Sequence, residues 1–240
     1  MEPANPGKRL NKYIADSGYC SRREADRLIG EGRVTLDGRP GALGDRVQPG
    51  MSVAVDGRLL SGESARIYIL LNKPRGIVCT ADPREPMNVV DYIGHPARIF
   101  PVGRLDKDSE GLLLLTSDGG IVNRLLRAAG GHEKEYEVEI DRPVTAEFAQ
   151  KMMSGVSILD TVTLPCKVRR TGARSFNIVL VQGLNRQIRR MCEALGANVI
   201  HLRRVRIMNL RLGRLQPGQW RDLTPHELAE LMDSLEVREQ

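Results

Sequence analysis

The chain has 240 residues, enough for one large domain or for a small and a larger one, and two domains are the better expectation. Its 36 Lys and Arg residues, against 30 Asp and Glu residues, leave a net charge of +6 and an isoelectric point near 9.3, which favours polyanionic partners. No run approaches the roughly 18 apolar residues of a membrane span, and the N-terminus lacks the apolar core of a signal peptide. We therefore expect a cytoplasmic protein without membrane association.

Cysteine spacing argues against two further classes of protein. The four cysteines, Cys20, Cys79, Cys166 and Cys192, lie far apart and form no C-x-x-C pair. Neither a zinc ribbon nor a disulfide framework is indicated by this spacing, so reduced and mostly buried thiols are expected.

The first part of the chain predicts two short helices. Apolar residues recur at helical spacing from Leu10 to Ile14, and the first helix should end near Ser17. Ser21 and Glu24 then form a capping box, in which the hydroxyl accepts from a free N–H and the carboxylate reaches back to the cap residue. A second helix is expected directly after Ser21.

Basic residues and two short strands complete this segment. Strands are expected at 34–36 and 53–55, each ending at an Asp-Gly turn. Arg22, Arg23 and Arg27 should project away from the apolar stripe of the second helix. An isolated charged helix most often presents such arginines to solvent, so their spacing alone does not establish a binding surface.

The order RLNKYIADSGYCSRREADRLI, followed by GRVTLDGR, resembles the S4 RNA-binding domain over residues 9 to about 57. The resemblance implies two helices packed on a small sheet, with basic side chains presented to RNA phosphates. Phosphate contacts require cations and position a protein on RNA, while sequence or shape is read elsewhere. The residues that fall on matching positions are Lys12, Arg22, Arg23 and Arg27.

A second domain is expected after a linker. Residues 58–66 are small and polar, and they would separate a domain at 8–57 from one at 67–240. The second part mixes modest helical stretches with short apolar runs at 67–71, 112–115, 136–140, 176–181 and 199–205, which is typical of mixed helix and strand content.

Two helix starts and one basic track are marked in this part. Thr145 precedes an expected helix at 146–153, and Thr224 with Glu227 forms a second capping box before an acidic C-terminal helix. Between residues 186 and 214 there are eight arginines and one acid. Such a stripe is a plausible track for polyphosphate.

The stretch FPVGRLDKDSEGLLLLTSDG, residues 100–119, is the most informative part of the chain. It predicts a charged loop from Gly103 to Gly111 between two buried strands, and a rigid scaffold fixes such residues in place. A solvated turn is an equally simple interpretation of Asp106, Asp108 and Glu110. A metal site is the weaker proposal, because the EF-hand order of ligands is absent.

The motif GRLDKDSEGLLLLT resembles the catalytic motif of the pseudouridine synthase family that comprises RsuA, RluB, RluE and RluF. Supporting matches are NKPRG at 72–76, KEY at 134–136 and GLNRQIRRM at 183–191. The resemblance implies an α+β protein: a small S4-type helix-plus-sheet domain, then a synthase domain with a mixed, mainly antiparallel sheet flanked by helices. It also implies isomerisation of uridine in RNA without a cofactor or a metal.

On this resemblance, Asp106 is the essential catalytic aspartate. The reaction must break the N1–C1′ bond of a uridine, turn the uracil and join C5 to C1′. A carboxylate can begin it by attacking C1′ or by removing the C2′ proton, and the sequence does not distinguish the two routes.

The resemblance also implies the other site residues. Arg189 would pair with Asp106 in a bidentate ion pair, and its neighbours Arg186 and Arg190 would meet phosphate. Tyr136 would stack on the target base, which must leave its own stack to react. Three lower-ranked assignments are Arg104, which would hold open the vacated space, Lys73, which would brace the pocket, and Ile188, which would line the uracil site.

Met208-Asn209, together with the segments 132–136 and 190–193, is similar to the RluF branch of this family. That similarity implies large-subunit (23S) ribosomal RNA as the partner, with a transfer RNA stem-loop as a second candidate, and a monomer is expected. Three alternatives stay open: a non-catalytic S4-type assembly factor, the same isomerase acting on transfer or small-subunit ribosomal RNA, and a nucleoside glycosidase that would release uracil.

Overall fold

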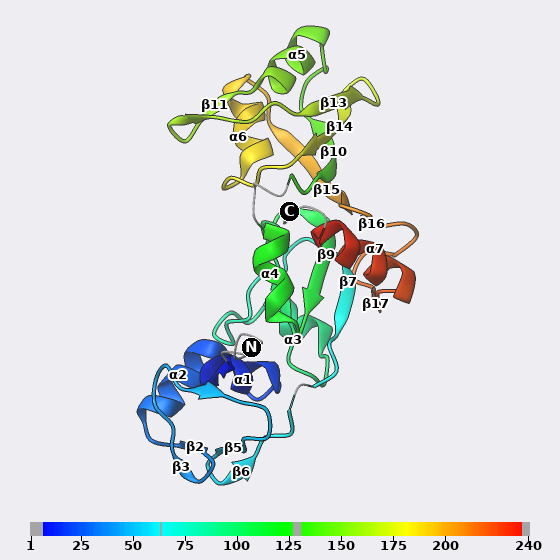
Figure 1. Ribbon diagram of the computed structural model, residues 1–240. Helices are drawn as coiled ribbons and strands as arrows, with labels where there is room; N and C mark the ends of the chain where they lie inside the picture. The colour runs from blue at the N-terminus through cyan, green and yellow to red at the C-terminus, as the bar shows by residue number, and fades with distance from the viewer. Residues whose placement is uncertain (1–6, 63, 127–130, 237–240) are drawn as a thin grey trace. The chain divides into compact units, whose positions relative to one another are not determined.

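The computed structural model of the protein describes residues 7–62, 64–126 and 131–236, which divide into two compact units. The first unit consists mainly of the N-terminal segment up to Ile67. The second unit contains most of the remaining chain, and Figure 1 shows its helices and strands.

The first unit has two helices and two small sheets around one apolar core. The core is built from both helices and the strands, with Ile14, Ala25 and Val53 fully buried. Its helices are α1 (Leu10–Asp16) and α2 (Arg22–Gly30), and its strands are β1 (Lys8–Arg9), β2 (Val34–Leu36), β3 (Arg39–Pro40), β4 (Arg46–Val47), β5 (Val53–Val55) and β6 (Arg58–Leu59). The four-stranded sheet has the order β3-β2-β5-β6, and β1 pairs with β4. The two predicted helices and the two predicted strands are confirmed.

Both Asp-Gly turns have the backbone that tight hairpins require. Asp37 and Gly38 have φ of 48° and 80°, and Asp56 and Gly57 have φ of 48° and 77°. Positive φ at both central residues matches the twist of the flanking strands. The second turn leads into β6, which pairs with β5. The expectation that a linker begins at residue 58 was therefore wrong, since 58–59 still belong to this sheet.

The second helix starts as predicted, but only half of its capping box forms. The Ser21 hydroxyl accepts from the Glu24 N–H at 3.1 Å. The Glu24 carboxylate turns instead to Arg27, whose guanidinium also pairs with Glu31. Arg27 is thus already held by two carboxylates, in contrast to the free phosphate-binding cation expected from the sequence.

The second unit is organised around a nine-stranded mixed sheet. Its order is β13-β14-β10-β15-β9-β7-β17, with β8 on β9 and β16 on β15. The contact of β15 with β9 is parallel and the other pairs are antiparallel. Its strands are β7 (Tyr68–Lys73), β8 (Phe100–Val102), β9 (Glu110–Thr116), β10 (Lys134–Ile140), β13 (Lys167–Arg170), β14 (Ser175–Leu180), β15 (Val199–Ile207), β16 (Leu210–Arg211) and β17 (Trp220–Asp222). The predicted mixed, mainly antiparallel sheet is confirmed.

Helices flank this sheet in two places, as Figure 1 shows. Two of them, α5 and α6, share an apolar cluster with β10 and β14, while α4 and α7 share another with β7 and β9. A small hairpin, β11 (Ser157–Ile158) and β12 (Thr161–Val162), precedes β13. The helices are α3 (Val89–Ile93), α4 (Gly119–Leu126), α5 (Ala146–Ser154), α6 (Gln187–Ala194) and α7 (Pro225–Glu236).

The run Leu112–Leu115 is continuous because both faces of β9 are buried. Leu112 and Leu114 pack in the cluster that contains α4 and α7. Leu113 and Leu115, on the opposite face, are fully buried as well. A strand covered on two sides needs apolar residues at every position, so it loses the usual alternation. This rigid strand carries the charged loop that precedes it.

Both predicted helix starts in this unit are confirmed. The Thr145 hydroxyl accepts from the Phe148 N–H at 3.1 Å. At α7 the capping box is complete: the Thr224 hydroxyl accepts from the Glu227 N–H at 3.2 Å, and the Glu227 carboxylate accepts from the Thr224 N–H at 2.9 Å. Arg221 also donates to Glu227, and this hydrogen bond lowers the pKa of Glu227 to about 2.

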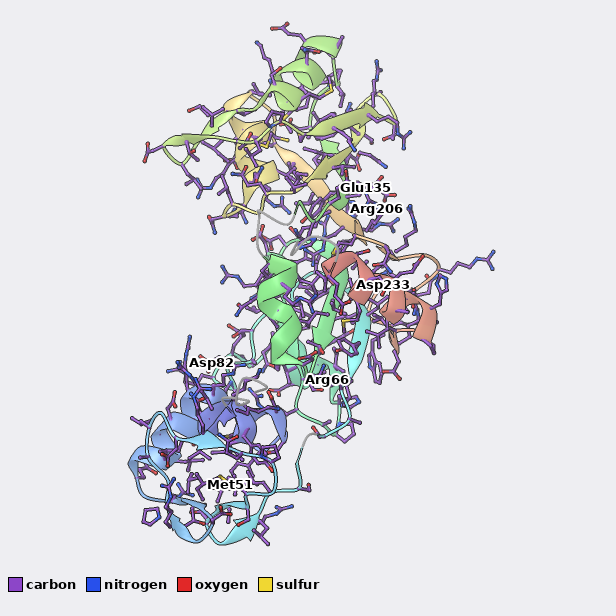
Figure 2. The ribbon with its side chains drawn as sticks, viewed as in Figure 1. Met51, Arg66, Asp82, Glu135, Arg206 and Asp233 are labelled. Carbon is purple, nitrogen blue, oxygen red and sulfur yellow. The ribbon has the colours of Figure 1, made fainter. Side chains whose placement is uncertain are left out.

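Glu227→Gln is expected to lower the free energy of unfolding by about 1 kcal/mol at pH 7, because the cap and the Arg221 pair are weakened. A depressed pKa contributes stability above the ordinary value of 4.5, and this contribution is lost as the pH falls toward about 2. The difference between wild type and variant should therefore shrink at pH 3, as measured by urea denaturation at both pH values. Asp233→Asn, at an exposed acid of the same helix (Figure 2), is the control.

None of the helices in the part of the chain that the structure describes has the length and apolar character needed to cross a lipid bilayer.

Candidate functional site

The loop that carries Asp106 is held from below by Lys73. This lysine, at the end of β7, is fully buried, and its ammonium group donates to the carbonyls of Pro74 and Ser109, each at 2.8 Å. Burial lowers the pKa of Lys73. The Gly76 N–H adds a bond of 2.8 Å to the Lys107 carbonyl. Lys73, which was assigned to the substrate-binding residues, is thus buried and bonded to the backbone of this loop.

Gly111 fixes the far end of the loop. It pairs with Arg204 where β9 meets β15, and its φ is +104°. A Cβ atom at this position would lie 2.3 Å from the carbonyl oxygen of Arg204 and 2.7 Å from its nitrogen. The close parallel approach of the two strands therefore requires glycine.

Two arginines lie beside the Asp106 carboxylate, which is one-third exposed. Its Oδ2 atom is 3.8 Å from Arg186 Nη1 and 4.0 Å from Arg189 Nε. These separations are ion pairs at long range, so the predicted bidentate pair of Asp106 with Arg189 is not formed. Both guanidinium groups nevertheless lie within ion-pair range of the Asp106 carboxylate.

Arg189 is instead engaged with the protein backbone. Its guanidinium donates to the carbonyls of Val199 and Asp108, each at 3.3 Å, and to the Ser109 hydroxyl at 3.2 Å. Burial, followed by the nearby charge of Arg186, lowers its pKa. In this geometry Arg189 ties α6 and β15 to the loop, which positions Asp106.

Arg186 reaches Asp106 from an unusual backbone conformation. It is the residue before α6, with φ of 51° and no side-chain capping bond. Residues other than glycine seldom adopt this left-handed conformation, which recurs at functional sites. The turn points the Arg186 side chain toward Asp106.

A cavity of about 1050 Å³ opens beside these residues within the second unit. Four predicted site residues line it together: Arg104 and Asp106 from the loop, Tyr136 from β10 and Arg186 from the start of α6. Side chains far apart in sequence are thus brought to one surface.

Three predicted contact residues lie elsewhere. Ile188 is buried in the apolar cluster around α5 and α6, because it is on the inner face of its helix. Arg190 donates to the carbonyl of Asn185 at 3.1 Å. Neither residue lines the cavity, and Leu184 occupies the apolar position there instead. Lys73 lies under the loop.

Sequence reasoning missed three basic residues of the cavity wall, Lys107 in the Asp106 loop, Lys134 and Arg204. Arg204 is 3% exposed, and its guanidinium carbon lies 6.0 Å from the centroid of the Tyr136 ring. The alternation of β10 places Lys134 on the same face as Tyr136, and this signal was available in the sequence. For Arg204 the necessary information is the pairing register, which a sequence does not contain.

Glu110, at the start of β9, is occupied by partners of its own. Its carboxylate lies 2.7 Å from His201 Nε2 and 3.5 Å from Arg75 Nε. Among the described residues, no three His, Cys, Asp or Glu side chains are grouped to hold a metal ion.

The basic residues predicted to contact phosphates from the first unit lie on its two helices. Lys12 is on α1, and Arg22 and Arg23 are at the start of α2. Within the described ranges, Arg22 and Arg23 make no ion pair, and both are exposed. They remain available to a polyanion, unlike Arg27.

Comparison with known proteins gives matches over nearly the whole chain. A family model described as RNA pseudouridylate synthase matches residues 67–194, and an S4 domain model matches residues 8–53. The chain is 53% identical over 230 residues to the dual-specificity RNA pseudouridine synthase RluF of Escherichia coli K12, with 95% of this chain and 79% of that protein covered. It is 36% identical over 233 residues to the ribosomal large subunit pseudouridine synthase B of Bacillus subtilis, with 93% and 95% covered. A crystal structure of a pseudouridylate synthase matches with a TM-score of 0.68 and 28% identity, covering 94% of this chain and all of that one.

Proposed function

The chain belongs to the RNA pseudouridylate synthase family, and from this premise we propose that it isomerises one uridine of large-subunit ribosomal RNA and accepts a transfer RNA stem-loop as a second substrate. The similarity to a dual-specificity enzyme and to a large-subunit enzyme supports this choice of RNA. We further propose that it acts as a monomer in the cytoplasm.

The observation that carries the proposal is the convergence of Asp106, Tyr136 and Arg186 on one cavity. A protein that only binds RNA has no need of a partly exposed carboxylate that is flanked by two cations and shares a cavity with an aromatic ring. The convergence is what isomerisation requires: a group that acts on the sugar, and a flat surface for the displaced base.

Asp106 begins the reaction in this proposal. As a carboxylate it either bonds to C1′ or removes the C2′ proton, and in both cases the N1–C1′ bond breaks. Arg189 holds the loop through the Asp108 carbonyl and the Ser109 hydroxyl, so that the carboxylate keeps one orientation. Pre-orientation of the reacting group lowers the entropic part of the barrier.

Tyr136 serves as the platform for the uracil ring. A uridine that leaves its stack loses contacts on both faces, and an aromatic side chain replaces part of them. Arg104 and Arg186 are exposed at the cavity, where cations suit the backbone phosphates next to the flipped nucleotide.

The exposed cations of the first unit extend the RNA contact. Replacing both Arg22 and Arg23 with Gln should weaken RNA binding and reduce the slope of log K against log salt by about 1.5, since each phosphate contact contributes about 0.7 to 0.9. Filter binding across a salt series measures this slope. Lys151→Gln removes a charge from the exposed surface of α5 and should leave the slope unchanged. An unchanged slope in the double variant would contradict phosphate contact by these two residues.

The function is tested by mapping pseudouridine in ribosomal and transfer RNA after incubation with the protein. New pseudouridine at a defined site in each RNA supports the proposal and names both uridines. A site in small-subunit RNA alone would correct the substrate, and released uracil would indicate hydrolysis. Tight binding without any modified site would favour the assembly-factor alternative.

A further inference from the structure

The cavity contains a buried cation, Arg204, that pairs with no carboxylate among the described residues. The Arg204 side chain is 97% shielded from solvent, and its Nε atom donates to the Leu112 carbonyl at 2.7 Å. Its Nη2 atom is buried and has no hydrogen-bond partner among the described residues. Leaving a charged donor unsatisfied costs free energy, so such a group in a cavity wall indicates a missing partner.

A second cation lines the same cavity. Lys134 donates to the His132 carbonyl at 3.0 Å, and no carboxylate within the described ranges pairs with it. Burial, followed by the positive charge of Arg204, lowers the pKa of Lys134 to about 8. Two like charges near each other are unfavourable, and an anion between them would relieve their repulsion.

The opposite face of strands β10 and β15 differs from the cavity face in how its cations are paired. There the cations are paired: Arg206 bonds to Glu135 at 3.0 Å (Figure 2), and Arg203 bonds to Glu137 at 3.0 Å. Strands β10 and β15 thus carry matched charges on one side. On the cavity side, Lys134 and Arg204 have no carboxylate partner in the part of the chain that the structure describes.

Register places these two cations around the aromatic platform. Tyr136 is the cross-strand partner of Arg204, and Lys134 is two residues before Tyr136 on the same face of β10. Ile207, opposite Lys134, completes this floor of the cavity. A flat ring stacked on Tyr136 would therefore have two cations near its edge, Arg204 from β15 and Lys134 from β10.

We propose that Arg204 and Lys134 form an anion subsite that stabilises the uracil ring when it separates from the sugar. This inference rests on the proposed function. In this proposal Arg204 and Lys134 act like the hydrogen-bond donors of an oxyanion hole. They stabilise negative charge that develops only during the reaction.

The chemistry of the step creates such a charge. When the N1–C1′ bond breaks, its electron pair stays with the uracil, whose N1, O2 and O4 atoms share one negative charge. After the ring turns, C5 donates an electron pair to C1′. In the covalent route the C1′–O bond to Asp106 breaks at the same time and the carboxylate is released; in the other route C2′ takes back the proton that Asp106 removed. C5 then loses its proton and N1 gains one, so that no atom or electron is added or removed overall.

The subsite fits a base better than a phosphate. Arg204 is buried at the cavity floor, where a desolvated cation interacts strongly with charge that forms in contact with it. Arg104 and Arg186 are exposed and suit the strongly hydrated phosphates. A uracil ring stacked on Tyr136 would also lie closer to Arg204 than the phosphates of the RNA backbone would.

The test compares two RNA fragments that carry the mapped uridine or 5-fluorouridine at that position. Single-turnover loss of the N-linked nucleoside is followed by mass spectrometry of nuclease digests. Arg204→Gln should slow conversion of uridine by about 100-fold and Lys134→Gln by at least about 10-fold, as for loss of one oxyanion donor. The ratio of wild-type rate to variant rate should be several-fold smaller with 5-fluorouridine for both variants, because fluorine makes the departing ring a weaker base.

Arg206→Gln is the matched control, since it removes a paired cation from the opposite face of the same strands and should change neither rate as strongly. Arg204→Lys should recover part of the lost rate. If Arg204→Gln fails to fold, the partly exposed Lys134→Gln decides the test. The proposed subsite would be overturned if a variant lost the same factor in rate on both RNAs. It would also be overturned if the variant bound RNA more weakly, with a smaller slope of log K against log salt. An inactive wild-type protein would reject the proposed function itself.

Discussion

Asp106→Asn is expected to reduce pseudouridine formation by at least about four orders of magnitude, as for removal of an essential nucleophile. The amide keeps the shape of the side chain but loses the charge needed to attack C1′ or to remove the C2′ proton. RNA affinity should remain close to that of wild type, because the cations that meet phosphate are unchanged. Folding should be nearly unaffected, since Asp106 is one-third exposed and its ion pairs are long.

The measurement is single-turnover conversion of the mapped uridine, with RNA affinity determined in parallel. Asp108→Asn is a matched control on the same loop, because its side chain is exposed and only its backbone carbonyl is used by Arg189. This control should retain most of the activity. Substantial conversion by Asp106→Asn, or comparable losses in both variants, would remove Asp106 from the reaction.

Gly111→Ala is expected to destabilise the second unit by more than about 3 kcal/mol, combining backbone strain with a steric clash. The new methyl group would lie 2.3 Å from the carbonyl oxygen of Arg204, and backbone atoms cannot give way as a flexible side chain can. Relief requires β9 and β15 to separate. The loop would then lose its anchor, and activity should fall with stability.

Urea denaturation followed by circular dichroism measures the loss. Gly172→Ala is the control in the same unit, since a Cβ atom there meets the Ser175 side chain at an ordinary 3.7 Å. It should change the free energy of unfolding by less than about 1 kcal/mol. Similar stabilities for Gly111→Ala and Gly172→Ala would contradict the steric argument.

Local chemistry explains why parts of the fold could be predicted. The starts of α2, α5 and α7 depend on the hydroxyls of Ser21, Thr145 and Thr224, which bond to backbone N–H groups three residues later. Such contacts are contained in a few consecutive residues. The order of the strands is not local, and the parallel contact of β9 with β15 could not be derived.

The same distinction applies to the candidate site. The stretch around Asp106 and the strand with Tyr136 were identifiable from motifs, and both residues line the cavity. The bidentate pair of Asp106 with Arg189 was wrong, because the buried guanidinium binds backbone carbonyls that no motif specifies. Ile188 lies in an apolar cluster and not in the cavity lining, because helical spacing does not say which face of α6 meets the core. Arg204 became visible only through its cross-strand register with Tyr136.

The late position of β15 in the chain has a consequence for synthesis on the ribosome. The loop with Asp106 emerges early, but the strand that fixes its end and supplies Arg204 follows much later, and the bond from Arg204 to Leu112 spans 92 residues. Domains form in the order in which they are translated. The first unit can therefore fold and engage RNA while the nascent chain still lacks a complete cavity, and the enzyme stays inactive until β15 has been translated.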